Sequence, residues 1–211
     1  MTSAKHLVFI DENLSDITFI VENLPEGSQW FTINGSRDGV SQIEQIAKNY
    51  ENLDSIQIVS HGNSGALTIG STALTNQNLS HYQTSLSEIG KSLSSDGDLL
   101  IYGCNLAANE NGEKLINGIA EYTLADVAAS TDLTGSSAMG GDSDLEFRTG
   151  EVLTSVINMS GLTENLVWSD SQIESALTNT TLEDKMKDYN SDNSYSYLEM
   201  RTLLETAAVG G

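Results

Sequence analysis

Two residues whose side chains can cooperate in covalent catalysis each follow a short apolar run of the sequence. His61 comes directly after Ser55–Ser60 (SIQIVS), and Cys104 follows Asp98–Tyr102 (DLLIY) and Gly103. A cysteine attacks as its thiolate, and a nearby imidazole can accept the thiol proton or stabilise the anion. If the two runs are neighbouring parallel strands, both side chains project into one crevice at the carboxyl ends of the sheet. The pair is therefore a candidate for catalysis by a cysteine nucleophile with histidine assistance.

Each of these two residues has a glycine beside it, which bears on how a substrate approaches. Gly62 follows His61, and Gly103 precedes Cys104. A residue without a side chain lets a substrate backbone come close and leaves amide N–H groups free. We expect the N–H groups of Gly62 and Cys104 to stabilise the oxyanion of a tetrahedral intermediate. A structural alternative stays open, because a cysteine after an apolar strand is commonly a buried small hydrophobic residue, and a histidine there often only makes hydrogen bonds.

The elements that must position this pair are short apolar runs alternating with amphipathic helices. The expected strands are His6–Asp11, Gln29–Ile33, Ser55–Ser60, Asp98–Tyr102 and Asp126–Ala129. The expected helices are Gly39–Tyr50, Leu79–Leu93 and Glu113–Tyr122, with hairpins over Leu67–Leu74 and Leu145–Ile157. This alternation predicts βαβ units, and hence an α/β domain whose mostly parallel sheet is sandwiched by helices. The sequence becomes more polar near Gly161, which predicts one domain over residues 1–160 and a second over 161–211.

The composition is strongly acidic, with 30 acidic and 9 basic residues and a formal net charge of -21. Such a surface repels phosphate backbones, which argues against a nucleic-acid partner. Cys104 is the single cysteine, so an intrachain disulfide is impossible. No stretch reaches the roughly 18 apolar residues of a membrane-spanning helix. The acidic balance favours secretion, and because the N-terminus lacks a signal-peptide pattern, export by a non-classical or type I route is expected.

Five sequence blocks between Leu7 and Val152 carry a resemblance to known families. The blocks are Arg37-Asp38-Gly39, Ile58–Gly62, Leu100–Asn105, Asp126–Ser130 and Gly140-Gly141-Asp142. Over this roughly two-thirds of the chain, the sequence resembles an uncharacterised domain family found near the N-termini of very long bacterial surface proteins and adhesins. The blocks around His61 and Cys104 also resemble the catalytic blocks of caspases, gingipains, clostripain and the self-cutting domains of large bacterial toxins.

The resemblance implies a caspase–hemoglobinase-like fold and a cysteine endopeptidase. Cys104 is then the nucleophile and His61 the general acid and base. The implied substrate is a polypeptide, with the protein's own chain as one candidate, and the implied setting is a larger protein that is secreted or displayed on a bacterial cell surface. A catalytically inactive adhesin or surface module with the same fold is the alternative.

The resemblance also implies a position for the substrate pocket. The loop Ser130-Thr131-Asp132 follows the strand after the cysteine strand and would help to line the first specificity pocket. An acid there would favour Arg or Lys in the substrate, although Asp132 can equally be a turn former. Asp11 either orients His61 or caps its own loop, and Asp142 either contacts a cation or substrate or belongs to a hairpin turn.

The C-terminal part contains a twelve-residue run with the ligand spacing of an EF-hand calcium loop. The expected oxygen ligands are Asp188, Asn190, Asp192, Ser194, Ser196 and Glu199. Asn193 replaces the usual glycine of the loop, and asparagine tolerates positive φ better than most residues. The flanks Leu182–Tyr189 and Tyr197–Ala208 predict an entering and an exiting helix. We therefore expect a small helical EF-hand-like appendage with Ca²⁺ as the cofactor; a solvated Asn/Asp/Ser linker is the alternative.

Overall fold

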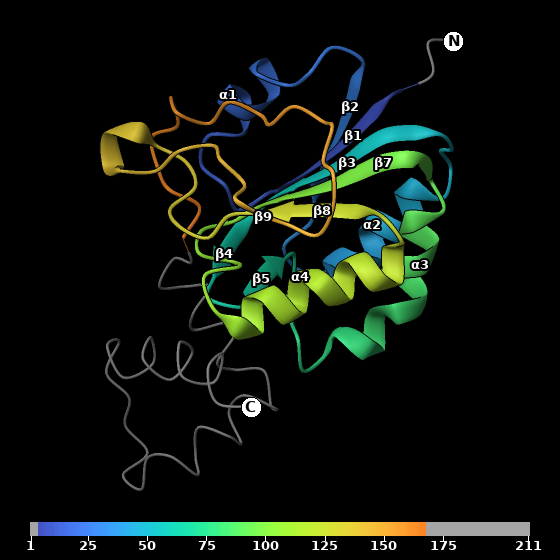
Figure 1. The fold of residues 1–211 in the computed structure, drawn as a ribbon. Coiled ribbons are helices and arrows are strands. Elements are labelled where there is room, and N and C mark those ends of the chain that lie inside the picture. Colours follow the sequence, from blue (N-terminus) through green and yellow to red (C-terminus); the bar gives the residue numbers. More distant parts are fainter. Residues whose placement is uncertain (1–3, 168–211) are drawn as a thin grey trace, which may run out of the picture. The chain divides into compact units, whose positions relative to one another are not determined.

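A six-stranded sheet forms the centre of the computed structural model, which describes residues 4–167 (Figure 1). Its strand order is β2-β1-β3-β7-β8-β9. The strands are β1 (His6–Asp11), β2 (Ser28–Ile33), β3 (Leu53–Val59), β7 (Leu93–Tyr102), β8 (Asp126–Ala129) and β9 (Phe147–Arg148). All neighbours pair in parallel except β9, which is antiparallel to β8. The predicted α/β fold with a mostly parallel sheet is confirmed.

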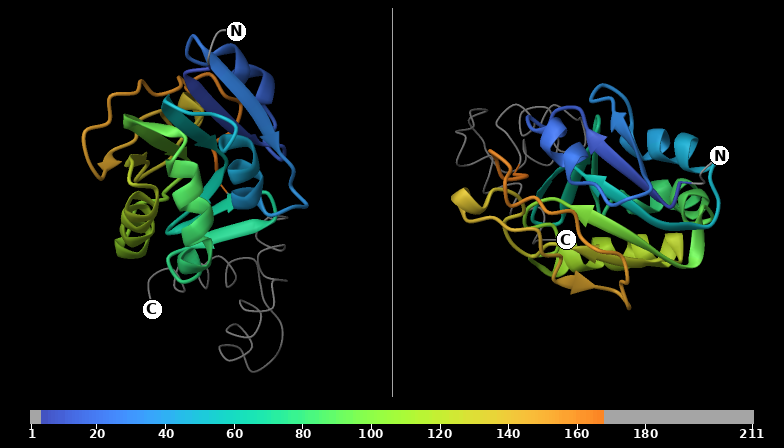
Figure 2. Two further views of the ribbon diagram at one scale, coloured as in Figure 1. Left: turned by 90° about the vertical axis from the view of Figure 1, so that its right-hand side faces the viewer. Right: turned by 90° about the horizontal axis from the view of Figure 1, so that it is seen from above.

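Helices cover the two faces of the sheet unequally (Figures 1 and 2). The helices are α1 (Ile17–Glu22), α2 (Gly39–Ala47), α3 (Gln83–Gly90) and α4 (Glu110–Thr123), with short 3-10 turns η1 (Leu79–Tyr82) and η2 (Ser137–Met139). Helices α2, α3 and α4 lie on one face, whereas α1 and the mostly irregular segment 133–167, apart from β9, cover the other. The helix predicted over Leu79–Leu93 is divided between η1 and α3, and β7 already begins at Leu93.

Alternation along the strands produces two separate apolar cores. In β1, Leu7 and Phe9 belong to the core under α2, α3 and α4, whereas Val8 and Ile10 belong to the core under α1 and the 133–167 segment. All four side chains are fully buried. Successive strand residues point to opposite faces of a sheet, so a strand covered on both sides must be apolar throughout. This explains why the strands of the sequence appear as continuous apolar runs.

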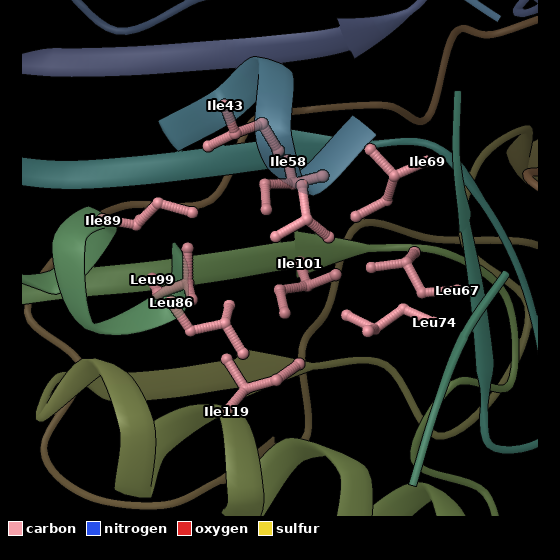
Figure 3. A pocket seen from close by; sticks show the side chains of 11 residues that line it. Ile43, Ile58, Leu67, Ile69, Leu74, Leu86, Ile89, Leu99, Ile101 and Ile119 are labelled. Atoms are coloured by element: carbon pink, nitrogen blue, oxygen red, sulfur yellow. The ribbon is translucent and has the colours of Figure 1, made fainter. Parts of the chain in front are cut away.

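A small cavity lies between the sheet and the three helices of the first core (Figure 3). Ile43 of α2, Ile58 of β3, Ile101 of β7 and Ile119 of α4 line it, and its other lining residues are also apolar. A cavity with no polar group on its wall offers no hydrogen-bond partner to water or to a polar ligand. It belongs to the hydrophobic interior.

A second, three-stranded antiparallel sheet begins at His61. Its strands are β4 (His61–Asn63), β5 (Ala66–Ile69) and β6 (Thr72–Thr75), in the order β4-β5-β6. The hairpin predicted over Leu67–Leu74 is confirmed, and Gly70 adopts a φ of 59° at its turn. Sequence patterning did not predict β4 or α1, because three- and six-residue elements are too short to display a period.

The terminal hairpin predicted over Leu145–Ile157 is wrong. Only Phe147–Arg148 forms a strand, and its partner is β8. The carboxylate of Asp98, which is buried, accepts hydrogen bonds from the N–H groups of Leu153 (2.9 Å) and Thr154 (2.7 Å). Side-chain oxygens of this kind compete with a ladder for backbone donors. The segment after β9 therefore crosses the sheet face as irregular chain.

The chain continues to pack on this domain beyond Gly161. Leu162 and Leu166 are buried in the same apolar cluster as Val8 and Ile10, and residues through Val167 form one compact unit. Within residues 4–167, no helix combines the length and the apolar composition that crossing a membrane requires.

The hydroxyl of Tyr102 ties the irregular segment to the sheet, which yields a stability prediction. It donates a hydrogen bond to Oε1 of Gln57 (2.8 Å) and accepts one from the N–H of Ile157 (2.9 Å), and all three residues are buried. Tyr102→Phe leaves a buried donor and a buried acceptor without partners, so we expect the free energy of unfolding to fall by about 1–3 kcal/mol in urea titrations.

Tyr50→Phe is the matched control. Tyr50 is half-buried and packs against Phe31 through its ring, so losing its hydroxyl should change the free energy of unfolding by less than about 0.5 kcal/mol. Equal losses in the two variants would refute the role assigned to Tyr102.

Candidate active site

His61 and Cys104 follow neighbouring strands and lie at the same edge of the sheet. β3 and β7 pair in parallel with Val59 opposite Tyr102. The N–H of Ser60 continues the ladder by donating to the carbonyl of Tyr102 (3.1 Å). The juxtaposition of the two strand ends that the sequence predicts is therefore present.

Gly62 and Gly103 allow the two strand ends to approach each other. A Cβ atom on Gly62 would lie 2.8 Å from the carbonyl carbon of Gly103, and one on Gly103 would lie 3.1 Å from Cα of Gly62. Any larger residue at Gly62 would push the two backbones apart. From the sequence we expected these glycines to admit a substrate backbone, whereas in the structure they allow the contact between the histidine and cysteine segments.

The thiol of Cys104 is enclosed. The residue has no exposed surface and belongs to the apolar cluster under α1. Its Sγ accepts a hydrogen bond from the N–H of Thr134 (3.2 Å) and donates one to the carbonyl of the same residue (3.3 Å). Burial raises the pKa of the Cys104 thiol to about 12. In this arrangement the sulfur is a neutral thiol at physiological pH.

The imidazole of His61 is also buried, with 4 % of its surface exposed. Burial lowers its pKa below the ordinary value of 6.5, and the negative charges of Glu164 and Asp11 oppose this effect. Its Nδ1 atom has no hydrogen-bond partner among the described residues. A neutral imidazole with an unpartnered nitrogen is able to accept a proton.

Asp11 caps its own loop. Its Oδ1 accepts a hydrogen bond from the N–H of Asn13 (2.9 Å), and its Oδ2 accepts one from the N–H of Gly70 (2.9 Å). Oδ2 of Asp11 also accepts a hydrogen bond from the hydroxyl of Ser60 (3.3 Å). These hydrogen bonds fix the turn after β1 against the β5–β6 turn, and Asp11 affects His61 only through its charge.

The two N–H groups expected to stabilise an oxyanion converge on one carbonyl oxygen. The N–H of Gly62 donates to the carbonyl of Leu166 (3.0 Å), and the N–H of Cys104 donates to the same oxygen (3.2 Å). Sequence reasoning named both donors but missed the acceptor. A backbone carbonyl carries no residue-type signal, so no sequence pattern could have identified it.

The segment that supplies this carbonyl is held by backbone hydrogen bonds on both sides, with isolated bridges at Asn165 and Val167. On one side the N–H of Leu166 donates to the carbonyl of Thr134 (2.8 Å), and the N–H of Ser136 donates to the carbonyl of Glu164 (3.1 Å). On the other side Val167 forms a parallel bridge with Gly62. Residues 164–167, called here the cleft segment, therefore lie between the 134–136 loop and the end of the histidine strand.

The Gly140-Gly141-Asp142 block makes room for the cleft segment. A Cβ atom on Gly141 would lie 2.4 Å from Oδ1 of Asn165. Nδ2 of Asn165 donates to the carbonyl of Met139 (3.2 Å), and its Oδ1 is buried without a partner among the described residues. The Asn165 side chain therefore occupies space that any side chain at position 141 would need.

The loop Ser130-Thr131-Asp132 lies directly against the residues after Cys104. The carbonyl of Asp132 accepts a hydrogen bond from the N–H of Asn105 (2.6 Å), and the carbonyl of Ser130 accepts one from the N–H of Ala107 (2.9 Å). The Asp132 N–H donates to Oγ of Ser130 (3.1 Å), as in a turn. The loop thus lies beside the cysteine, and its side chains have a turn-forming role.

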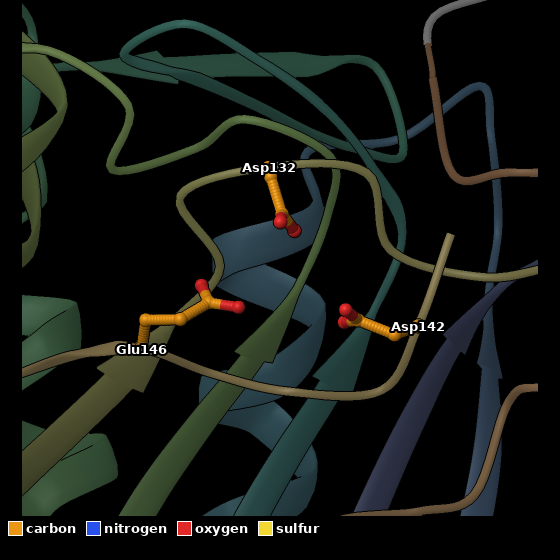
Figure 4. Close-up of side chains that lie close together, drawn as sticks. All are labelled: Asp132, Asp142 and Glu146. Carbon is orange, nitrogen blue, oxygen red and sulfur yellow. The ribbon is translucent and has the colours of Figure 1, made fainter. Parts of the chain in front are cut away.

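Asp132, Asp142 and Glu146 form an exposed acidic cluster (Figure 4). One carboxylate oxygen from each lies within 4.8 Å of the others. Partial burial and the charges of Glu146 and Asp142 raise the pKa of Asp132. Carboxylates in this arrangement can ligate a hard cation such as Ca²⁺. Glu146, which the sequence analysis missed, also accepts the N–H of Thr131 (2.7 Å). The calcium ligands predicted at Asp188, Asn190, Asp192, Ser194, Ser196 and Glu199 lie outside the described residues.

The fold and the strand ends define an α/β protein with a mostly parallel sheet and a histidine–cysteine pair at the carboxyl ends of two neighbouring strands. Residues 7–165 match the family described as Domain of unknown function (DUF4347), and the chain belongs to that family. A comparison with curated proteins gives no match. The matched region contains both strand ends and all but the last two residues of the cleft segment.

The lowered pKa of His61 predicts a loss of stability in mild acid. As the pH falls through about 6.5, the imidazole of the unfolded chain binds a proton that the buried imidazole resists, so the unfolded state is favoured. We expect the free energy of unfolding of the wild type to fall more steeply below that pH than that of His61→Gln, in urea titrations at a series of pH values.

His81→Gln is the control for this measurement, because His81 is an exposed histidine of η1. Its pH dependence should match that of the wild type. A wild-type slope that His61→Gln leaves unchanged would show that His61 is not the group responsible.

Proposed function

We propose that this protein is a cysteine endopeptidase in which Cys104 is the nucleophile and His61 the general acid and base. The observation that carries the proposal is the convergence of the Gly62 and Cys104 N–H groups on one carbonyl oxygen. Two backbone donors aimed at a carbonyl are the arrangement that stabilises the oxyanion of acyl transfer. As the sequence resemblance implies, the setting we propose is a larger exported bacterial surface protein.

In the proposed reaction His61 removes the thiol proton as Cys104 Sγ attacks a peptide carbonyl. The negative charge moves to the carbonyl oxygen, where the N–H groups of Gly62 and Cys104 are already aligned. His61 then protonates the leaving amine, and the resulting thioester is hydrolysed by water that the same imidazole activates. A lowered pKa on His61 suits the first step, because a neutral imidazole is the form that accepts a proton.

The buried thiol favours a second candidate, a non-enzymatic surface module. The Cys104 thiol, with a pKa of about 12, is a poor source of thiolate, and its hydrogen bonds with Thr134 are those of a structural residue. Both observations describe an arrangement in which Cys104 is fully buried in the apolar cluster that includes Leu166 of the cleft segment. The two candidates differ in whether His61 controls the chemistry of Cys104.

A peptidyl electrophile separates the two candidates. We expect a leucyl chloromethyl ketone to alkylate Cys104 in the complete 211-residue chain, and His61→Ala to slow this alkylation by about 100-fold, the size of a general-base contribution. The measurement is intact mass against time, with His81→Ala as the matched histidine control. Alkylation that is equally fast in wild type and His61→Ala, at the rate of an ordinary thiol, would support the surface module.

We also propose that Ca²⁺ binds the loop Asp188–Glu199. Six oxygen ligands ending in a glutamate that can bind through both oxygens fit a hard cation. Glu199→Gln should abolish most of the heat of calcium binding in isothermal titration, and Glu121→Gln, an exposed glutamate of α4, should not. If Asp142→Asn removes the heat and Glu199→Gln does not, the ion is held by the acidic cluster of Asp132, Asp142 and Glu146.

A further inference from the structure

We infer that the cleft segment is an intramolecular substrate and that the peptide bond between Leu166 and Val167 is the bond hydrolysed. This inference rests on the proposed dyad function and adds to it a specific substrate. It begins from the position of the Leu166 carbonyl, whose oxygen accepts hydrogen bonds from the N–H groups of Gly62 (3.0 Å) and Cys104 (3.2 Å). A carbonyl between these two donors is polarised for attack.

The backbone of the cleft segment is held on both sides of this carbonyl. Its antiparallel pairing with the 134–136 loop uses the N–H of Leu166 and the carbonyl of Glu164, and its parallel bridge to Gly62 lies at Val167. Backbone pairing of a peptide with neighbouring segments is a recurrent mode of peptide binding, in which main-chain hydrogen bonds give affinity and side-chain contacts give specificity.

The side chains on the two sides of the Leu166–Val167 bond lie in different environments. Leu166 has 1 % of its surface exposed and packs in the apolar cluster that contains Cys104 and Tyr102, whereas Val167 is 42 % exposed. The residue before the bond therefore fills an apolar pocket. This pocket favours a large aliphatic side chain, in contrast to the Arg or Lys preference that Asp132 would give, because the carboxylate of Asp132 is exposed in the acidic cluster.

The imidazole of His61 lies close to Val167, the residue that follows this bond. A backbone group of Val167 contributes to the electrostatic environment of its imidazole, as does the carboxylate of Glu164. The Nδ1 atom of His61 is buried and has no hydrogen-bond partner among the described residues, so it is able to take a proton in the tautomer that carries its hydrogen on Nε2. A thiol proton moving from Cys104 to the imidazole would give this side chain a positive charge beside two carboxylates, Glu164 and Asp11.

The proposed step balances with water as the only co-reactant. The Cys104 proton passes to His61 as Sγ bonds to the carbonyl carbon of Leu166. The C–N bond to Val167 then breaks, and the proton on His61 moves to the Val167 nitrogen, which leaves as an amine. Water hydrolyses the thioester, which restores the thiol and leaves a carboxylate on Leu166. Because attacking and attacked groups belong to one chain, the reaction has the advantage of proximity.

The test is to incubate the complete chain of 211 residues, with and without Ca²⁺, and to map new termini by intact mass and N-terminal sequencing. We expect a fragment that ends at Leu166 and one that begins at Val167 in the wild type, and neither in Cys104→Ala. His61→Ala should slow the appearance of both fragments by about 100-fold. Fragments that also form in Cys104→Ala would overturn the inference.

Two leucine variants separate recognition from loss of stability. Leu166→Ala and Leu162→Ala each remove a buried leucine from the same apolar cluster. Only Leu166 precedes the proposed bond, so Leu166→Ala should lower the cleavage rate by about tenfold relative to Leu162→Ala. Equal cleavage rates in the two variants would contradict the assignment of Leu166 to the pocket.

The outcomes distinguish this inference from the proposed function. If leucyl chloromethyl ketone alkylates Cys104 in a His61-dependent manner but the Leu166–Val167 bond remains intact under both calcium conditions, the peptidase proposal stands and the intramolecular substrate is excluded. If alkylation then becomes faster in Leu166→Ala than in Leu162→Ala, the cleft segment is an uncut inhibitor. If neither alkylation nor cleavage depends on His61, the proposed function fails as well.

Discussion

Close packing of Gly62 against Gly103 determines the geometry of the candidate site. Parallel pairing of β3 with β7 brings the two strand ends to one edge of the sheet, and the absence of side chains at both glycines lets the backbones meet. This contact aligns the N–H groups of Gly62 and Cys104 so that both reach the Leu166 carbonyl. A side chain at Gly62 would separate the donors, because atoms of Gly103 already occupy the space of its Cβ.

Burial shifts the pKa values of Cys104 and His61 in opposite directions. Burial disfavours the charged form of each group, so it raises the pKa of Cys104 and lowers that of His61. Both residues are therefore neutral in this arrangement. Leu166 and Leu162 belong to the apolar cluster that contains Cys104, whereas backbone hydrogen bonds of Thr134 and Leu166 oppose the effect of burial on the pKa of the thiol.

Strands that are buried on both faces were predictable from the sequence, whereas a segment held by a distant side chain was not. β1, β3, β7 and β8 were predicted because strands covered on both faces are continuous apolar runs, and the β5–β6 hairpin was predicted from Gly70 and its flanks. The prediction of a hairpin over Leu145–Ile157 was wrong because the N–H groups of Leu153 and Thr154 donate hydrogen bonds to the buried carboxylate of Asp98. These N–H groups are therefore not available for pairing between two strands. A side chain that is distant in sequence overrode a local turn signal.

The apolar periodicity of the chain is enough to predict the α/β class and to place His61 and Cys104 after two strands of a mostly parallel sheet. That these two strands are neighbours comes from the pairing of β3 with β7. The packing of distant segments also buries Cys104, makes His61 the first residue of a second sheet, and brings the Leu166 carbonyl to two amide donors. These features arise from backbone hydrogen bonds and burial between distant segments, which residue identity does not encode locally.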